Sequence, residues 1–258
     1  MPSPIKGHVM RHDRRLEELW SSAAPSEHVF DPNSVSSLPP VAQRYLKHAL
    51  APGAKCSTCA RLSMTGTIKL KPGWCKFEAE QVLRWDRGFV WAATAKVNGL
   101  PVTGFDRLVD GVGAMRWKLL GLFPVIKADG AEIARAAAGR LHAEAIWLPA
   151  ALLDKEVSWV DRGSDHTVAI FDAHGEHAEL DLEVSPAGAL LSCCLSRWGD
   201  RNTGVFAYHP FGGAAEQEQS FAGVTIPIRL RVGWLFGTPA FESEGEFFRC
   251  TLHSVQYR

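Results

Sequence analysis

From Ala60 onward the sequence consists of short apolar runs separated by turn residues, and this pattern limits the fold more than any other feature. The first runs are RLSMTGTIKL, CKFEAEQVLRW and FVWAATAKV, separated by Lys71-Pro72-Gly73 and Asp86-Arg87-Gly88. Short runs joined by Gly, Pro and Asp turns are typical of antiparallel strands. The pattern therefore predicts a meander of strands, and similar runs continue to the end of the sequence.

Alternation of side chains within these runs assigns one face of the expected sheet to the core. Phe77, Ala79 and Leu83 alternate with Glu78 and Glu80 along the second run. Successive side chains of a strand point to opposite faces, so one set lies against the core and the more charged set faces solvent or a cavity.

Three segments are expected to be helical instead. Residues 129–151 have high helix propensity and apolar residues at helical spacing, so one or two helices are predicted to interrupt the sheet. The segment PPVAQRYLKHAL has proline in its first turn and ends before Ala51-Pro52-Gly53, which predicts a second helix. The segment HDRRLEELWSSA predicts a short amphipathic helix nearer the N-terminus.

These elements predict a mainly β (α+β) protein: a curved antiparallel sheet or half-barrel, with N-terminal and mid-chain helices covering its concave face. The chain has 258 residues, and a β-sandwich or barrel can reach about 200 to 250 residues as one domain. We therefore expect residues 1–35 to form a polar N-terminal helical extension and residues 36–258 to form a single β-rich domain.

Composition argues against several classes of protein. The 28 basic and 28 acidic residues give a formal net charge of zero, whereas nucleic-acid-binding proteins usually carry a basic face. No stretch approaches the roughly 18 apolar residues of a membrane span, and MPSPIKGHVMRHDRR lacks the apolar run of a signal peptide. We expect a cytoplasmic protein with no nucleic-acid partner and no membrane span.

Motifs for cofactors and metals are missing or incomplete. The sequence has no phosphate-binding loop of the GxxxxGK type, and GVGAM lacks the third glycine of a dinucleotide site. Cys56 and Cys59 form a single CxxC pair, whereas a structural zinc site needs two further ligands. The cluster HGEH lies in an expected hairpin turn, without the helical spacing of a zinc protease. We therefore expect no cofactor, no metal and six reduced cysteines.

Six segments resemble the recurring blocks of a large uncharacterised bacterial family of conserved hypothetical proteins. They are LPPVAQRYLKHAL, GFDRLVDGVGAMRWKLLG, GRLHAEAIWLPAALL, YHPFGG, FAGVTIPIRLRVGW and GEFFR, and they extend over residues 38–258. In fold, this family is similar to the lipoprotein-carrier half-barrels, in which a curved antiparallel sheet and a helical lid enclose an acyl-binding cavity. The resemblance implies a cavity of this kind, although the sequence shows no signal peptide of an exported carrier.

Two groups of charged residues in the first part of the chain are candidates for a site. Glu144 lies among apolar residues, which favour a neutral carboxyl group suited to acid or base catalysis. The alternative is an ion pair with Arg140, four residues earlier on the same helix face. Asp106 and Arg107 could lie at the rim of a cavity, or else belong to the hairpin turn that Asp110-Gly111 predicts.

A third group combines Arg197, Tyr208 and His209. Arg197 ends one predicted strand and the other two follow in the next segment, so the three could meet at one sheet edge. Such a set would suit recognition of a carboxylate or carbonyl group. The alternative is structural packing of the neighbouring aromatic residues, with His209 in solvent.

Glu246 is the last charged candidate. It stands two residues before Phe248, so in a regular strand both side chains share one face. An inward Glu246 would indicate function, whereas an outward one would be a cross-strand partner of Arg229 or Arg231.

The aromatic balance favours a ligand pocket. The chain has nine tryptophans and three tyrosines, and Trp91, Trp147 and Trp234 fall inside expected regular elements. Pockets for small molecules are mainly apolar and aromatic, with a few polar groups that set orientation. Our leading hypothesis is that the protein binds a small hydrophobic or amphipathic molecule, with these tryptophans as the wall and Arg197 or Arg107 as the polar anchor.

Two other functions are consistent with the sequence. A cofactor-independent enzyme, such as a cyclase, isomerase or hydrolase acting on an apolar substrate, would use Glu144 and His209 as acid and base. A non-catalytic interaction protein would use the N-terminal helix for docking. The enzyme needs two titratable groups within reach of one substrate atom, whereas a binding protein needs one anchoring charge.

Overall fold

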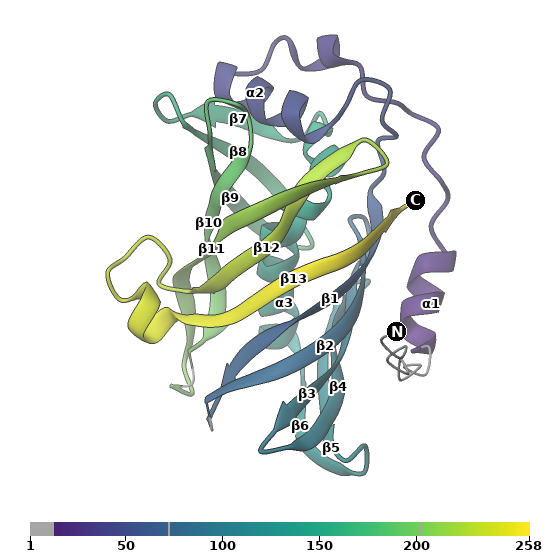
Figure 1. The fold of residues 1–258 in the computed structure, drawn as a ribbon, viewed down its shortest axis with the longest axis vertical. Coiled ribbons are helices and arrows are strands. Elements are labelled where there is room, and N and C mark those ends of the chain that lie inside the picture. The colour runs from purple at the N-terminus through teal and green to yellow at the C-terminus, as the bar shows by residue number, and fades with distance from the viewer. Residues whose placement is uncertain (1–12, 72, 202) are drawn as a thin grey trace, which may run out of the picture.

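The computed structural model describes residues 13–71, 73–201 and 203–258. Strands dominate this part of the chain, as the run and turn pattern predicts (Figure 1). In chain order they are β1 (Cys59–Leu70), β2 (Gly73–Arg84), β3 (Gly88–Val97), β4 (Leu100–Val109), β5 (Val112–Leu119), β6 (Phe123–Asp129), β7 (Ser158–Asp161), β8 (His166–Ala173), β9 (Glu176–Val184), β10 (Leu190–Asp200), β11 (Phe206–Phe221), β12 (Val224–Trp234) and β13 (Glu246–Tyr257).

The three segments predicted to be helical are helical, and two further short turns, at Pro32–Val35 and Phe241–Gly245, were not predicted. The Asp13 side chain accepts a hydrogen bond from the Arg15 amide and caps the first helix, and proline occupies the first turn of the second. No helix of the described residues is long and apolar enough to cross a membrane. The helical segments are α1 (Arg14–Ser21), η1 (Pro32–Val35), α2 (Pro40–Ala49), α3 (Ala131–Ala143), η2 (Glu144–Trp147), η3 (Pro149–Leu153) and the π-helical turn η4 (Phe241–Gly245).

Within the described residues, thirteen strands form one sheet in the order β6-β5-β4-β3-β2-β1-β13-β12-β11-β10-β9-β8-β7. Two meanders, β1 to β6 and β7 to β13, meet where β1 pairs antiparallel with β13. The edge strands β6 and β7 are consecutive in the chain, so the segment between them has to cross the sheet. This segment contains α3, which packs on β5 of one meander and on β9 and β10 of the other, inside the curve of the sheet (Figure 1).

The main core lies between this crossing segment and the concave face. Leu141 and Leu148 are fully buried there, in one cluster with Leu83 of β2 and Leu180 of β9. The buried side of α2, including Leu46, joins the same cluster near β7, β8 and β12. The expected class, a mainly β curved antiparallel sheet with helices, is confirmed, and α2 and α3 both lie on its concave side.

The first helix departs from the expected arrangement. Leu16 and Leu19 of α1 pack on Val82 and Val90, whereas Leu83 belongs to the main core. Since adjacent residues of a strand point to opposite faces, α1 covers the outer face of β2 and β3 and not the concave one. These strands carry apolar side chains on both faces, so their sequence does not indicate which face a helix covers.

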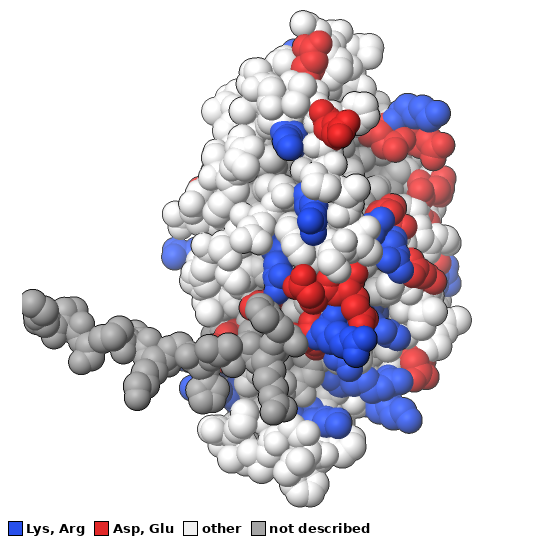
Figure 2. Space-filling view, turned by 90° about the vertical axis from the view of Figure 1, so that its right-hand side faces the viewer, with Lys and Arg blue, Asp and Glu red and all other residues white. Residues whose placement is uncertain are grey.

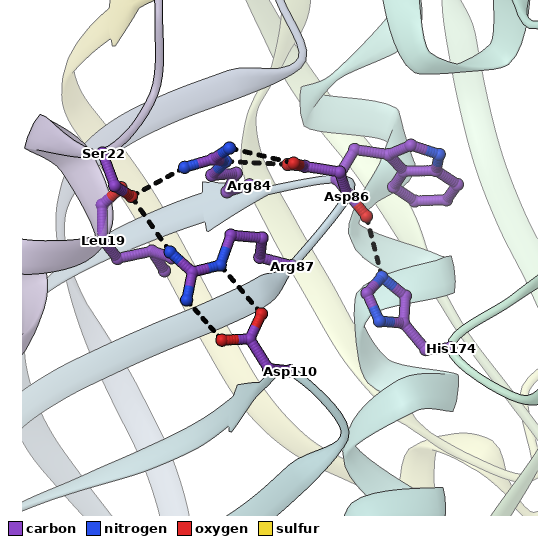
Figure 3. A network of polar contacts seen from close by, with 8 residues as sticks. Leu19, Ser22, Arg84, Asp86, Arg87, Asp110 and His174 are labelled. Carbon is purple, nitrogen blue, oxygen red and sulfur yellow. Dashed lines mark hydrogen bonds and ion pairs between the residues drawn. The ribbon is translucent and has the colours of Figure 1, made fainter.

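Polar contacts hold α1 on this outer face (Figure 3). The Ser22 hydroxyl accepts hydrogen bonds from Arg84 at 2.6 Å and from Arg87 at 3.3 Å. The Arg87 guanidinium also binds the Asp110 carboxylate, with one contact at 2.8 Å. Asp110 and Gly111 both have positive φ, 51° and 78°, at the β4–β5 turn, which confirms the hairpin predicted from Asp-Gly.

Candidate functional site

A cavity of about 270 Å³ lies between the α3–η2 segment and the concave face of the sheet. This is slightly below the range of about 300 to 1,000 Å³ that is usual for small-molecule sites. Its side chains come from both meanders, and most are apolar. The lining residues are Ile68, Trp91, Asp106, Met115, Arg140, Ala143, Glu144, Ile146, Trp147, Cys193, Arg197, Phe211, Gly212, Gly213, Leu230, Val232, Trp234, Phe247 and Phe248.

Aromatic rings form much of the cavity wall. The Trp91 ring lies 5.6 Å from that of Trp117 and 6.2 Å from that of Phe248. On the other meander, the rings of Phe211 and Trp234 meet edge to face at 5.1 Å. Contacts of this geometry add about 0.5 to 1.5 kcal/mol per pair beyond burial. The wall therefore contains two sets of packed rings.

One side of the cavity carries a connected polar group. Arg140 Nε donates to Glu144 Oε1 at 2.7 Å, and Arg140 Nη1 donates to Asp106 Oδ2 at 3.4 Å. The Gln81 amide donates to Glu144 Oε2 at 2.6 Å, and Trp117 Nε1 donates to Asp106 Oδ1 at 2.8 Å. The ion pair between Arg140 and Glu144, expected as the alternative to a catalytic Glu144, is present.

Burial shifts the Asp106 carboxyl toward its neutral form. Desolvation raises the pKa of Asp106, against the lowering effects of Arg140 and of the hydrogen bond from Trp117. Burial disfavours the charged form of an acid, and here it outweighs the neighbouring cation. Arg140 and Glu144 neutralise each other, so any net charge on this side of the cavity is that of the ionised form of Asp106.

Arg197 is the remaining charged side chain of the lining. Its Nε donates to the Ala136 carbonyl of α3 at 3.1 Å, and its guanidinium lies over Phe211 at 4.4 Å and Trp234 at 5.0 Å. Burial, with the repulsion of Arg140, lowers the pKa of Arg197 from 12.5 to about 9, so the group is protonated at neutral pH. No carboxylate of the described residues forms an ion pair with it, since both acids of the lining bind Arg140.

Two glycines make room for this arrangement. A Cβ at Gly139 of α3 would lie 2.9 Å from Arg197 Cγ, so the glycine lets the arginine stem pass close to the helix. A Cβ at Gly199 would lie 2.5 Å from the Trp234 ring. Glycine inside a helix lowers helix stability by about 1 kcal/mol relative to alanine. At Gly139 the missing side chain leaves the space that Arg197 occupies.

The structure brings six of the ten candidate residues together in this cavity. They come from β3, β4, β10, β12 and the α3–η2 segment, which are distant in sequence. The six are Trp91, Asp106, Glu144, Trp147, Arg197 and Trp234. Arg107, Tyr208, His209 and Glu246 lie outside the lining.

A β-bulge moves Glu246 away from the cavity. Val232 pairs with Phe248 but Gly233 pairs with Glu246, so Phe247 is an extra residue in β13. The expected shared face of Glu246 and Phe248 is therefore wrong, because the bulge reverses the alternation. Glu246 is buried and binds Arg231 and Arg249 at 2.7 to 3.0 Å, which lowers its pKa to about 2.

Arg107 is separated from Asp106 by the alternation of β4. Arg107 pairs across the sheet with Val90, whose side chain lies under α1 on the outer face. Asp106 points to the concave side and reaches the cavity. The structure therefore places only Asp106 of this dipeptide at the site.

The group of Arg197, Tyr208 and His209 does not converge either. The Tyr208 hydroxyl donates to Glu176 at 2.9 Å and accepts from Arg135 at 2.8 Å, away from the cavity lining. His209 is directly opposite Arg197 in the sheet, and its ring lies 6.1 Å from that of Trp234. It shares the sheet face of Arg197 but does not line the cavity.

Sequence reasoning missed Arg140, Met115 and Phe248 as cavity residues, and Gln81 as a hydrogen-bonding partner of Glu144. Gln81 stood on the apolar face of β2 with Ala79 and Leu83, and a buried amide requires a hydrogen-bonding partner. That signal pointed to a polar group inside the sheet. Met115 and Phe248 had no signal beyond being apolar strand residues.

Comparisons with known proteins give a family. The model of a family of unknown function, DUF6544, matches residues 28–243. A search among curated proteins finds no relative of this chain. The expected resemblance to an uncharacterised family agrees with the family match.

Solved structures to which this chain is similar include three proteins. A LolA superfamily protein from Nitrosomonas europaea is 6% identical with a TM-score of 0.46, over 84% of this chain and 92% of that one. A domain assigned to outer membrane lipoprotein sorting, from Vibrio parahaemolyticus, is 7% identical with a TM-score of 0.40, over 78% and 85%. A DUF1329 family protein from Desulfovibrio piger is 10% identical with a TM-score of 0.38, over 88% and 94%.

Proposed function

The chain belongs to the DUF6544 family, whose function is unknown, and we propose that its cavity binds a small amphipathic molecule with an apolar tail and one anionic head group. The observation that carries this proposal is Arg197, a protonated guanidinium that lines an apolar cavity without an ion pair among the described residues. Burying an unpaired charge is costly, and a carboxylate or phosphate head group would offset that cost through charge-assisted hydrogen bonds.

The other charged side chains of the cavity pair with each other and not with Arg197. Arg140 and Glu144 form an ion pair at 2.7 Å, and burial favours the neutral form of Asp106. A ligand with one negative charge therefore complements the cavity better than a neutral or cationic one.

The remaining lining residues suit an apolar tail. Trp91, Trp147 and Trp234 lie around the cavity with aliphatic side chains such as Ile146 and Leu230. Moving apolar surface from water into such a site contributes about 25 cal/mol per Å² of area buried. The head group thus sets the orientation of the ligand, and the tail supplies most of the free energy of binding.

The enzyme hypothesis has less support from the geometry. Both carboxylate oxygens of Glu144 accept hydrogen bonds, one from Arg140 and one from Gln81. His209, its expected partner in acid–base catalysis, is not in the lining. Two proton-transfer groups within reach of one substrate atom are therefore not assembled from these residues.

Titration calorimetry with decanoate, decanol and decyltrimethylammonium tests the proposal, because the three share one alkyl chain and differ in head-group charge. We expect decanoate to bind at least about ten-fold more tightly than decanol, since a hydrogen bond to a charged group contributes about 1.5 to 3 kcal/mol. The cation is expected to bind most weakly. Equal affinities for the three would contradict the role of Arg197, and absence of binding in all three would contradict the proposed function.

Native mass spectrometry of the purified protein, followed by denaturing extraction, identifies what the cavity retains. A co-purifying lipid or apolar metabolite with a carboxylate or phosphate group supports the proposal. A retained neutral or cationic compound would contradict the assignment of the head group.

A further inference from the structure

The hairpin formed by β5 and β6 exposes a row of apolar side chains. Leu122, Phe123 and Val125 are 71%, 60% and 52% exposed, and Leu120 and Ile126 are also exposed. Consecutive residues of β6 point to opposite faces, so neither face of this strand is covered at its start. Contiguous exposed apolar side chains of this kind mark an interaction surface.

The neighbouring β3–β4 turn extends this surface. The Leu120 amide donates a hydrogen bond to the Pro101 carbonyl at 2.8 Å, and Leu100 is exposed beside it. We call residues 100–101 and 120–126 together the hairpin tip. It lies at the lower end of the molecule in Figure 1, and this end is almost free of charged side chains in the view of Figure 2, with Lys and Arg above it.

The charges around the hairpin tip are basic. Lys96, Lys118 and Lys127 flank it on β3, β5 and β6, and none forms an ion pair with a described residue. The segments 88–105 and 111–128 contain no Asp or Glu. An apolar tip flanked by unpaired lysines complements a membrane surface that contains anionic lipids.

The backbone of β6 is protected against pairing with another strand. Pro124 has no amide hydrogen to donate, and the β5–β6 register shifts between Trp117 and Lys118. Proline, irregular register and lysine on an edge strand are features that prevent edge-to-edge association. A second copy that added a strand at β6 would also bring two sets of lysines together. These features favour a partner that contacts side chains over one that pairs with the backbone.

We propose that the hairpin tip docks onto the surface of a lipid bilayer that contains anionic lipids. The exposed Leu and Phe side chains enter the boundary of the acyl region, and the flanking lysines contact the lipid head groups. This surface is separate from the cavity residues, so docking goes beyond the proposed function and does not depend on it.

Flotation of the full-length protein with vesicles tests the proposal, using vesicles of phosphatidylcholine alone and of equal parts phosphatidylcholine and phosphatidylglycerol. We expect binding to the mixed vesicles and much weaker binding to the neutral ones. Leu122→Ser combined with Phe123→Ser should weaken binding at least about ten-fold, because two apolar side chains no longer enter the bilayer. Lys118→Gln combined with Lys127→Gln should weaken it by about ten- to thirty-fold on the mixed vesicles.

Matched controls separate the hairpin tip from general surface effects. Val160→Ser combined with Val205→Ser removes exposed apolar side chains elsewhere, and Lys155→Gln removes an exposed lysine; both should bind like the wild type. Circular dichroism and thermal unfolding of each variant check that the substitutions, all at exposed positions, leave the fold unchanged.

Three outcomes would overturn the proposal. In the first, the wild type does not bind mixed vesicles, or the hairpin tip variant binds as well as the wild type. In the second, Arg197→Met abolishes vesicle binding, which would show that lipid enters the cavity without docking at the tip. In the third, light scattering shows a dimer that Leu122→Ser with Phe123→Ser dissociates, which would make the tip an interface between copies of the chain.

Discussion

Replacing Arg197 with methionine separates ligand binding from folding stability. Methionine has an unbranched side chain like the apolar stem of arginine, but it lacks the guanidinium. In the wild type the guanidinium contacts the Ala136 carbonyl and the rings of Phe211 and Trp234. A residue present mainly for stability would lower the free energy of unfolding when replaced. A residue present for binding would lower ligand affinity with little change in stability.

The effect on binding follows from the lost charge-assisted hydrogen bonds. Such bonds contribute about 1.5 to 3 kcal/mol, which corresponds to a decrease in affinity of about 10- to 150-fold at 25 °C. For decanoate we therefore expect a dissociation constant at least ten-fold higher in Arg197→Met than in the wild type. The affinity for decanol, which has no charge, should change by less than about three-fold.

The effect on stability comes from two opposing contributions. Folding lowers the pKa of Arg197 from 12.5 to about 9, so the folded state disfavours the charged form of this side chain. At about 1.4 kcal/mol per pKa unit, the cost of keeping it charged is about 5 kcal/mol. Methionine removes this cost but also the hydrogen bond to Ala136 and the two ring contacts, which contribute about 3 to 5 kcal/mol together. We expect the free energy of unfolding to change by less than about 2 kcal/mol.

Urea denaturation and titration calorimetry on the same preparations check both values. A matched control is Leu141→Ala, which truncates a fully buried core residue and should lower the free energy of unfolding by about 2 to 5 kcal/mol. The reasoning is refuted if Arg197→Met is destabilised as much as this control, or if decanoate affinity is unchanged in the folded variant.

Four further predictions follow from the same geometry. Decanoate affinity should be constant near neutral pH and fall as pH rises through about 9, where Arg197 loses its proton, while decanol affinity stays constant; a flat decanoate profile in calorimetry would contradict the anchor. Asp106→Asn removes a carboxyl group whose ionised form repels the ligand and should tighten decanoate binding about two- to five-fold. Weaker binding would show that the carboxyl group contacts the ligand. Trp234→Leu should weaken decanoate and decanol alike, by about 1 to 2 kcal/mol in calorimetry, and an unchanged affinity would place the ring outside the ligand contact. Burial lowers the pKa of His142 from 6.5 to about 4. The free energy of unfolding should therefore be constant above a pH of about 6.5 with respect to this group and decrease by about 3 kcal/mol as the pH falls toward 4. Urea denaturation should show a smaller decrease in His142→Gln, and an equal decrease would assign the effect to other groups.

The sequence by itself determined the elements and much of the architecture. Turns such as Asp110-Gly111 require positive φ at both residues, which few residue pairs tolerate, so hairpin positions are encoded locally. Proline at the start of α2 and the alanine-rich segment of α3 act over a few residues as well. The cytoplasmic location stays a prediction.

The sequence also determined part of the site, where strand alternation is regular. Trp91 and Asp106 lie opposite each other in the sheet, and both point into the cavity. The alternation of side chains along each strand was sufficient to predict that these two residues share a face, because β3 and β4 pair without a bulge. The single extra residue Phe247 in β13 reverses the pattern, and this irregularity depends on pairing with β12, which is not visible in β13 alone.

Only the tertiary structure decided which charge is left without a partner. Arg140 and Arg197 are both arginines in apolar surroundings, but the helical spacing of four residues gives Arg140 a carboxylate at 2.7 Å. Arg197 reaches the same cavity from the far meander, past Gly139 of α3, and meets a carbonyl and two aromatic rings. A local sequence can specify a neighbour four residues away, whereas the partner of a residue across the sheet depends on how the crossing segment packs on both halves.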